Sequence, residues 1–192
     1  MEKNQQGKFI ILSGPSGVGK NTIAAFLLNE LPDLQFAISA TSREIRPGEE
    51  EGVNYYYLSA DTFKETIAND GFLEWAEVYE GTHYGTLWSE VHRIWDQDKV
   101  MISDIDVLGG TQLKEKLGDQ ALAIFLAPPS LEELEQRLRS RGTDTEDKIR
   151  IRLDRVKEEL TYQDAYDVVI INDTLEKAQS DALKTIVEFL RV

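Results

Sequence analysis

A glycine-rich segment near the N-terminus, GPSGVGKNT at positions 14–22, carries the residue types of a phosphate-binding loop. It follows the apolar run Phe9–Leu12 and precedes IAAFLLNEL, whose apolar residues recur at helical spacing. The glycines allow the backbone to wrap with its N–H groups pointing inward, and Lys20 adds a positive charge for the outer phosphates of a nucleotide. A GxxxxGK pattern between a strand and a helix therefore predicts a triphosphate site rather than a glycine-rich turn with a solvated lysine.

Asn21 departs from the strict form of this pattern, which has Ser or Thr at that position. Its amide oxygen accepts hydrogen bonds but is a poorer partner for Mg²⁺ than a small hydroxyl. We therefore expect the ion to be held through water or by Thr22. The predicted ATP-binding loop consists of Gly14, Pro15, Ser16, Gly17, Val18, Gly19, Lys20, Asn21 and Thr22.

A second group of residues, in ATSREIRPGEEEGVNYYYLS, suits a small phosphate group. Arg43 and Arg46 offer two fork-shaped guanidinium groups, and Tyr55 offers a phenol. Further along the chain, HYGT supplies the hydroxyls of Tyr84 and Thr86. These side chains predict a site that holds a phosphate from several directions.

Glu74, in FLEWAEVY, is a lone carboxylate in an apolar and aromatic segment, and its burial requires a hydrogen-bond donor. Guanine presents a ring N–H and an exocyclic amine side by side, whereas adenine has no such matched pair. We interpret Glu74 as a base-reading residue, with Ser39 or Thr86 donating to the guanine carbonyl. The alternative is that Glu74 and Asp106 form a buried pair satisfied by backbone N–H groups.

Short apolar runs separated by stretches of helical spacing predict buried parallel strands in an α/β core. The runs are Phe9–Leu12, Val100–Ser103, Ala121–Leu126 and Val168–Ile171. The region 36–84 differs, because Tyr55–Leu58 and Phe72–Tyr79 resemble strands around a short helix near Asp61–Ala68. We interpret this region as an insertion into the core.

The segment PPSLEELEQRLRSRGTDTEDKIRIRLDRVKEEL predicts two helices, because capping boxes begin at Ser130 and at Thr143. Arg137 and Arg141 are four residues apart and share a helix face. Arg152 lies on the apolar side of its helix, where it meets an anion, extends along the edge of the core or pairs with a nearby acid.

The same segment contains two arginines, Arg139 and Arg155, to which we assign no chemistry. For both we expect a solvated helix face with salt bridges.

The composition limits the partners of the chain. With 35 acidic and 21 basic residues among 192, the net charge of −14 opposes binding to nucleic acid or to anionic membranes. There is no cysteine, which excludes disulfides and thiolate metal sites. Neither a signal peptide nor an apolar run of about 18 residues is evident. We expect one domain, in the cytoplasm, and infer no obligate protein partner.

In their order, these motifs resemble the guanylate kinase family nearly from end to end. The motifs are GPSGVGK, SATSREIRPGEEEGVNYYYLS, GFLEWAEVYEGTHYGT, ISDIDVLGG, FLAPPSLEELEQRLRSRGTDT and VVIINDTLEKA. The resemblance implies a P-loop NTPase three-layer α/β core with a parallel sheet, an inserted mixed α/β GMP-binding subdomain and a helical lid. Within the single domain 1–192, the core covers about 1–35, 98–128 and 160–192, the subdomain about 36–97 and the lid about 129–159.

The activity implied by the resemblance is the Mg²⁺-dependent transfer of phosphate from ATP to GMP, and to dGMP. The implied GMP-binding residues are Ser39, Arg43, Arg46, Tyr55, Glu74, Tyr84, Thr86, Asp104 and Asp106. The implied catalytic residues are Lys20, Arg43, Arg137, Arg141 and Arg152; ATP also meets Arg137, Arg141 and Asn172. For Mg²⁺ we expect only weak contacts, through water, from Asn21 and Asp104. Asn172 alternatively belongs to a simple turn or a helix cap.

The chain departs from the usual family pattern at Asn21, at Glu44 and Ile45, at Leu108, and by an extra residue between Trp75 and Tyr84. None of these departures removes an implied ligand. Two other functions compete with the primary one: a related P-loop kinase of another nucleoside phosphate or a ribose phosphate, and a non-catalytic guanylate-kinase-like interaction module.

Overall fold

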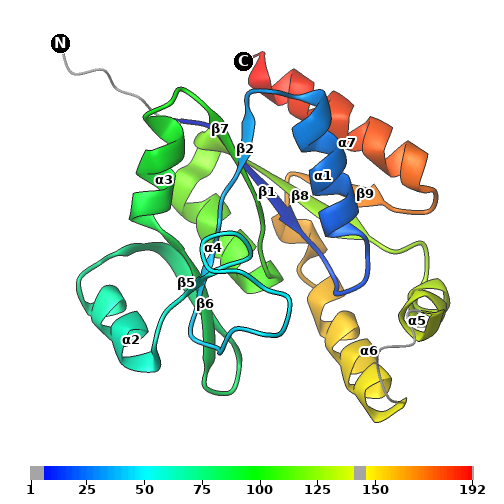
Figure 1. Cartoon of the computed structure of the whole chain (residues 1–192). Coiled ribbons are helices and arrows are strands. Elements are labelled where there is room, and N and C mark those ends of the chain that lie inside the picture. The colour runs from blue at the N-terminus through cyan, green and yellow to red at the C-terminus, as the bar shows by residue number, and fades with distance from the viewer. Residues whose placement is uncertain (1–6, 141–145, 192) are drawn as a thin grey trace.

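A five-stranded parallel sheet forms the centre of the computed structural model, which describes residues 7–140 and 146–191 (Figure 1). The strand order is β2-β7-β1-β8-β9, and each neighbouring pair is parallel. The strands are β1 (Phe9–Ser13), β2 (Leu34–Phe36), β7 (Val100–Asp104), β8 (Ala121–Ala127) and β9 (Val168–Ile171).

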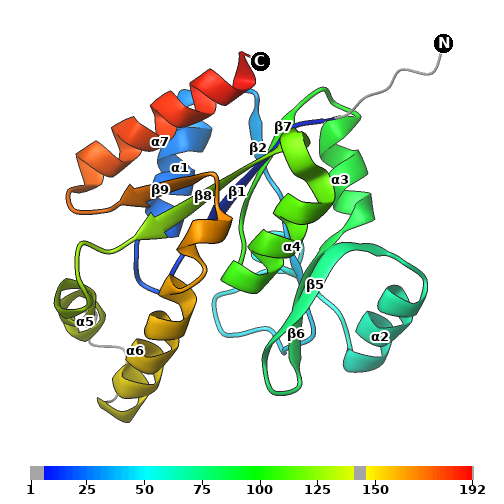
Figure 2. The same cartoon turned by 180° about the vertical axis from the view of Figure 1, so that it is seen from behind.

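Helices cover both faces of this sheet, as Figures 1 and 2 show from opposite sides. Helices α1 (Lys20–Glu30) and α7 (Leu175–Leu190) pack on the face that carries Ile10 and Leu12. On the other face, α3 (Trp88–Trp95) and α4 (Val107–Leu117) pack against Phe9 and Ile11. Alternate residues of β1 therefore enter two different cores, and the predicted three-layer α/β architecture is confirmed.

The apolar runs expected to form parallel strands all do so, and the structure adds the edge strand β2. This strand has only three residues, too few to show a periodicity in the sequence. Two short 3₁₀ helices, η1 (Gly118–Gln120) and η2 (Gln163–Ala165), precede β8 and β9.

A second, mixed sheet has the strand order β4-β3-β6-β5. It contains β3 (Ala40–Thr41), β4 (Tyr56–Tyr57), β5 (Phe72–Tyr79) and β6 (Thr82–Leu87), and helix α2 (Ala60–Ala68) lies against it. The predicted strand at 72–79 and the predicted helix are confirmed, whereas β3 and β6 were not predicted. This small sheet has its own apolar cluster, in which Phe63 stacks on Phe72 with ring centroids 4.4 Å apart.

Helices α5 (Leu131–Ser140) and α6 (Glu146–Leu160) pack on each other through Leu134, Leu138 and Val156. As predicted, Ser130 caps α5, because its Oγ accepts a hydrogen bond of 3.1 Å from the Glu133 N–H. The second predicted cap, Thr143, lies outside the described residues. Among the helices described, none is long and apolar enough to cross a membrane.

The buried carboxylate of Glu90 in α3 joins the two sheets. It accepts hydrogen bonds from the Ile38 N–H at 2.9 Å and from the Tyr56 hydroxyl at 3.1 Å. The Arg93 guanidinium donates two more, at 2.8 and 2.7 Å. Ile38 lies between β2 and β3, and α3 lies between β6 and β7, so Glu90 holds both chain connections between the sheets.

Replacing this acid should destabilise the whole chain. Glu90→Ala leaves the Ile38 N–H and the Arg93 guanidinium without their buried acceptor, so we expect a loss of about 2–4 kcal/mol in the free energy of unfolding. Urea denaturation measures this loss, with Glu115→Ala, an exposed glutamate in α4, as the matched control. A change below about 0.5 kcal/mol in Glu90→Ala would contradict the assigned role of this carboxylate.

Candidate active site

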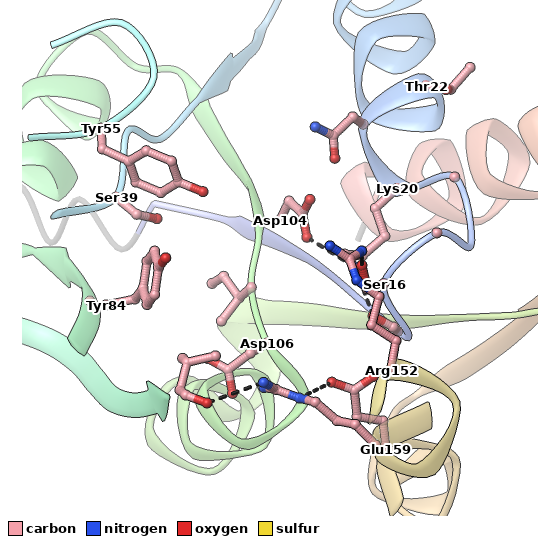
Figure 3. A pocket seen from close by; sticks show the side chains of 18 of the residues that line it. Ser16, Lys20, Thr22, Ser39, Tyr55, Tyr84, Asp104, Asp106, Arg152 and Glu159 are labelled. Carbon is pink, nitrogen blue, oxygen red and sulfur yellow. Dashed lines mark hydrogen bonds and ion pairs between the residues drawn. The ribbon is translucent and has the colours of Figure 1, made fainter. Parts of the chain in front are cut away.

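A cavity of about 520 Å³ lies between the loop after β1, the small sheet and α6. Figure 3 shows Ser39, Tyr55 and Tyr84 on one side of it, facing Lys20 and Arg152 on the other. The cavity brings together most of the residues predicted from the sequence. These are Gly14, Ser16, Gly17, Gly19, Lys20, Asn21, Thr22, Ser39, Tyr55, Glu74, Tyr84, Asp104, Asp106 and Arg152.

The glycine-rich loop has the backbone conformation that its composition predicts. Gly14, Gly17 and Gly19 have φ angles of 137°, 93° and 103°, a region that side chains strongly disfavour. A β-carbon at Gly14 would also collide with the Leu126 carbonyl oxygen. Helix α1 begins at Lys20, within the segment 14–22, so its N-terminal dipole faces the cavity.

The Lys20 ammonium group is turned onto the loop. It donates to the Gly14 carbonyl at 2.7 Å and lies 3.6 Å from Asp104 Oδ1. Burial raises the pKa of Asp104, and the charge of Lys20 opposes this shift. Asn21 and Thr22 are exposed and line the cavity beside this pair.

Asn172 contacts the loop 14–22 but does not line the cavity. Its buried side chain donates from Nδ2 to the Val18 carbonyl at 2.7 Å. The same nitrogen lies 2.7 Å from where a β-carbon of Gly19 would be. The predicted loop residues Pro15 and Val18 are likewise buried behind the cavity wall.

Two carboxylates border Gly109 at the far end of the cavity. A β-carbon on this glycine would lie 2.9 Å from Glu74 Oε2 and 3.1 Å from Asp106 Oδ2. Asp106 caps α4, because its Oδ1 accepts from the N–H groups of Leu108 and Gly109. Backbone satisfaction, the alternative predicted from the sequence, therefore applies to one oxygen of Asp106, and a backbone hydrogen bond from Thr86 also stabilises the Glu74 carboxylate.

The hydrogen-bond partner of the Glu74 carboxylate is Thr86. Glu74 is 8% exposed. The Thr86 hydroxyl donates a hydrogen bond to its Oε1 at 2.7 Å. Burial raises the pKa of Glu74 to about 7; the charge of Asp106 adds to the shift, and the Thr86 hydrogen bond opposes it. Thr86 itself is fully buried behind the wall of the cavity.

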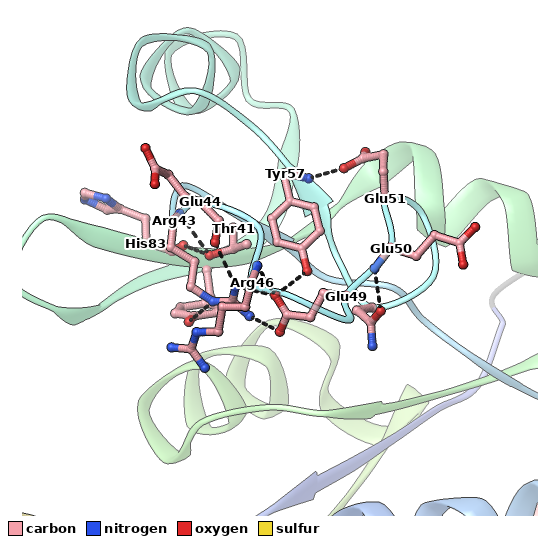
Figure 4. A network of polar contacts seen from close by, with 11 residues as sticks. Thr41, Arg43, Glu44, Arg46, Glu49, Glu50, Glu51, Tyr57 and His83 are labelled. Atoms are coloured by element: carbon pink, nitrogen blue, oxygen red, sulfur yellow. Dashed lines mark hydrogen bonds and ion pairs between the residues drawn. The ribbon is translucent and has the colours of Figure 1, made fainter. Parts of the chain in front are cut away.

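Arg43 lies beside the cavity in an unpredicted pairing with Glu49 (Figure 4). Its two terminal nitrogens donate to the two Glu49 oxygens at 2.7 Å each, and its Nε donates to the Tyr84 hydroxyl at 3.2 Å. The Arg43 guanidinium holds the pKa of Glu49 down at about 2. Arg46 is exposed, and its backbone N–H donates to Glu49 as well.

The predicted arginines of α5 and α6 have different surroundings. Arg152 reaches the loop, where its Nη1 donates to the Ser16 hydroxyl at 3.2 Å. Arg137 lies outside the cavity lining and donates to the carbonyls of Asn172 and Asp173 at 3.0 and 3.3 Å. Arg141 lies outside the described residues.

Sequence reasoning missed Arg155 and Glu159, which both line the cavity. The expected solvated helix face with salt bridges holds for Arg139, which is exposed and paired with Glu135 and Glu146. Arg155 forms an expected salt bridge, with Glu159, but it is only partly exposed and lines the cavity. A signal was present in the sequence, because position 155 lies three residues after Arg152 and shares its helix face. Val78, Gly85 and Ile105 also line the cavity without having been predicted.

A glycine loop that opens a helix, facing a buried acid on an inserted sheet, defines a P-loop phosphotransferase with a second substrate site. The model of the guanylate kinase family matches residues 6–190. A guanylate kinase of Bacteroides fragilis is 45% identical over 190 residues, covering 99% of this chain and 93% of the relative. One of Chlorobium luteolum is 42% identical over 189 residues, covering 98% and 95%.

A solved structure agrees with these matches. The crystal structure of guanylate kinase from Anaplasma phagocytophilum superposes with a TM-score of 0.76 at 29% identity, covering 95% of this chain and 85% of that one. The chain belongs to the guanylate kinase family. Guanylate kinases are nucleoside monophosphate kinases, which transfer phosphate from ATP to GMP, so neither alternative function raised by the sequence is favoured.

The raised pKa of Glu74 predicts how the stability of the free protein depends on pH. Its value of about 7 lies above the ordinary 4.5, so the stability linked to this group is present below pH 4.5 and is lost as the pH rises through 7. Glu74→Gln removes the ionisation. Without substrate, we expect the variant to gain stability relative to the wild type by up to about 3 kcal/mol between about pH 4.5 and 8.

Urea denaturation at several pH values measures this difference. Glu77→Gln, on the same strand but exposed, is the matched control. A difference between Glu74→Gln and the wild type that stays constant with pH would show that Glu74 does not titrate as its burial implies.

Proposed function

We propose that GMP phosphorylation takes place in the cavity described above, with ATP on the loop 14–22 and GMP, or dGMP, on the small sheet. The observation that carries this assignment is that Lys20 of the loop and the buried Glu74 line one cavity of about 520 Å³. In this assignment, residues of about 36–97 form the GMP-binding subdomain, and those of about 129–159 form a lid over the ATP loop.

The loop side of the cavity suits the triphosphate of ATP. Its inward N–H groups and the dipole of α1 stabilise phosphate oxygens, and Lys20 exchanges the Gly14 carbonyl for one of them. Arg152, already at Ser16, is close enough to the loop to reach the transferring group. We assign Arg137 and Arg141 to the same function, and Asn172 to holding the loop in shape.

The sheet side suits guanine and its 5′-phosphate. The Glu74 carboxylate accepts the ring N–H and the exocyclic amine of guanine, which compensates for its burial. Asp106 borders the same position, and Ser39 and Thr86 carry hydroxyls nearby. The phosphate then lies toward Tyr55, Tyr84, Arg43 and Arg46.

The residues beside Lys20 fit a magnesium ion. The carboxylate of Asp104 and the amide of Asn21 are oxygen donors on one cavity wall. In the described part of the chain no three His, Cys, Asp or Glu side chains gather for a metal, which suits an ion that keeps several waters and phosphate ligands. We assign the ion to Asp104 and, through water, to Asn21. When bound, it neutralises charge on the phosphates.

The transfer itself requires positioning more than covalent chemistry. A phosphate oxygen of GMP attacks the γ-phosphorus of ATP in line with the bond to the departing ADP. The protein therefore has to hold two anions close together and neutralise their charge. Lys20 and Arg152 provide positive charge on the loop side of the gap, and Arg43, bonded to Tyr84, provides it on the sheet side. The lid excludes water, which would otherwise hydrolyse ATP. A cytoplasmic location, and action on small molecules alone, remain predictions from the sequence.

A substrate panel tests the proposed base reading. With ATP and Mg²⁺, we expect GMP and dGMP to be phosphorylated with kcat/KM values about 10³-fold above those of AMP, CMP, UMP and ribose phosphates, since the other acceptors do not offer Glu74 two adjacent donors. Omitting Mg²⁺ should abolish turnover. A preference for another acceptor would contradict the assignment of Glu74.

Arg152 is expected to act mainly on the transferring phosphate. Arg152→Ala should lower kcat by about 10²-fold or more and change the KM for GMP far less, because the guanidinium stabilises charge in the transition state. Steady-state kinetics with both substrates varied measure the two effects separately. Arg139→Ala, which removes an exposed arginine from α5, is the control, and unchanged turnover in Arg152→Ala would refute the role.

A further inference from the structure

Arg155 connects α6 to the strand that carries Glu74. Its Nη1 donates to the Val78 carbonyl at 3.1 Å, and its Nε donates to Glu159 Oε1 at 2.9 Å. Val78 lies in β5, four residues after Glu74, and both Arg155 and Val78 line the cavity. One side chain of α6 is therefore hydrogen-bonded directly to the proposed guanine-binding strand.

The acceptor of this bond lies at a β-bulge in the edge strand β5. In the β5–β6 hairpin, Glu77 pairs with His83 and Tyr79 pairs with Thr82, so Val78 is an extra residue without a partner in the register. The carbonyl of this bulge residue is the one that accepts the hydrogen bond from α6.

A second bulge in the same strand, at Leu73, also has its carbonyl bound by a cation from a helix. Phe72 pairs with Leu87 and Glu74 with Thr86, which leaves Leu73 unpaired. The Leu73 carbonyl accepts a hydrogen bond of 2.7 Å from the Lys116 ammonium group of α4. Each bulge carbonyl in β5 is thus bound by a cation from a neighbouring helix, and the two bulges stand on either side of Glu74.

Glu159 holds Arg155 in the direction of the strand. It lies one helical turn further along α6, is 9% exposed and lines the cavity, as Figure 3 shows. Burial raises the pKa of Glu159, and the charge of Arg155 opposes the shift. The negative charge of Glu159 therefore attracts the Arg155 guanidinium to this edge of the cavity, where Asp106 is another acid.

Helix α6 has contacts with both halves of the proposed site. Arg152 reaches Ser16 in the ATP loop, and Arg155, less than one turn away, reaches Val78 in the GMP-binding subdomain. If α6 moves as a rigid body, its contacts with the loop and with β5 change together.

We propose that Arg155 is a positioning residue that couples the two substrate sites, so that GMP bound at Glu74 favours the position of α6 that closes over ATP. The proposal rests on the assignment of GMP to Glu74. Guanine orders β5, β5 presents the Val78 carbonyl, and Arg155 fixes α6 there. By linkage, each substrate then raises the affinity for the other by the same factor.

Titration calorimetry measures this coupling without turnover when ADP is the nucleotide. The affinity for ADP is determined alone and with saturating GMP, in the wild type and in two variants. Arg155→Met keeps the packing of the side-chain stem but loses both hydrogen bonds. Arg155→Lys keeps the positive charge, with its N–H donors on a single nitrogen. Arg139→Ala is the matched control, because Arg139 pairs only within the α5–α6 segment in the described structure.

We expect GMP to tighten ADP binding about 10-fold in the wild type and in Arg139→Ala, less than about 2-fold in Arg155→Met, and by an intermediate factor in Arg155→Lys. The affinity for ADP alone should be unchanged, which also verifies that the variants are folded. In kinetics, Arg155→Met should raise the KM for both substrates more than it lowers kcat.

Two outcomes would overturn the coupling role and leave the proposed function intact. In the first, Arg155→Met shows the same coupling as the wild type. In the second, the wild type binds GMP tightly but independently of ADP. A wild type that binds no GMP at all would instead refute the assignment of the GMP site, and the coupling role with it.

Discussion

The burial of the Glu74 carboxylate is the constraint around which the site is built. A carboxylate in an apolar strand is stable only when donors replace the lost water, and Thr86 supplies one of them. In the function proposed above, guanine meets the remaining demand, because it brings two donors in the right arrangement. The free protein then has an unfavourable burial of charge that the correct base relieves, and this is a physical basis for selectivity.

The rest of the small sheet presents this one side chain. Bulges at Leu73 and Val78 bend β5 on either side of Glu74, and Gly109 gives the carboxylate room that a β-carbon would occupy. The Glu90 network then fixes the sheet to the parallel core. The carbonyls of the two bulge residues in this edge strand are the ones that bind Lys116 and Arg155, so these local irregularities are consistent with function.

The sequence predicts the parts of this arrangement that depend on local pattern. The loop 14–22 and the long apolar strands follow from spacing alone, because their conformation is determined by neighbouring residues. Strands β2 and β3 are too short to show a period, and β6 is mostly polar, so their pairing depends on contacts distant in sequence. The partners of Arg43 and Arg155 were missed for a related reason. A turn brings Glu49 back to Arg43, and the bulge at Val78 depends on the register of a hairpin.

An acidic chain with a net charge of −14 must still bind two polyanions, and its cations show how this is achieved. Lys20 is held by the Gly14 carbonyl, Arg43 by Glu49, and Arg152 contacts Ser16, so each already has a protein acceptor near the place where we assign a phosphate. A phosphate then replaces an acceptor that the protein itself supplied, and the side chain needs little reorganisation. Exchange of partners, rather than capture by a broadly positive surface, allows local recognition of phosphate while the overall field repels other polyanions.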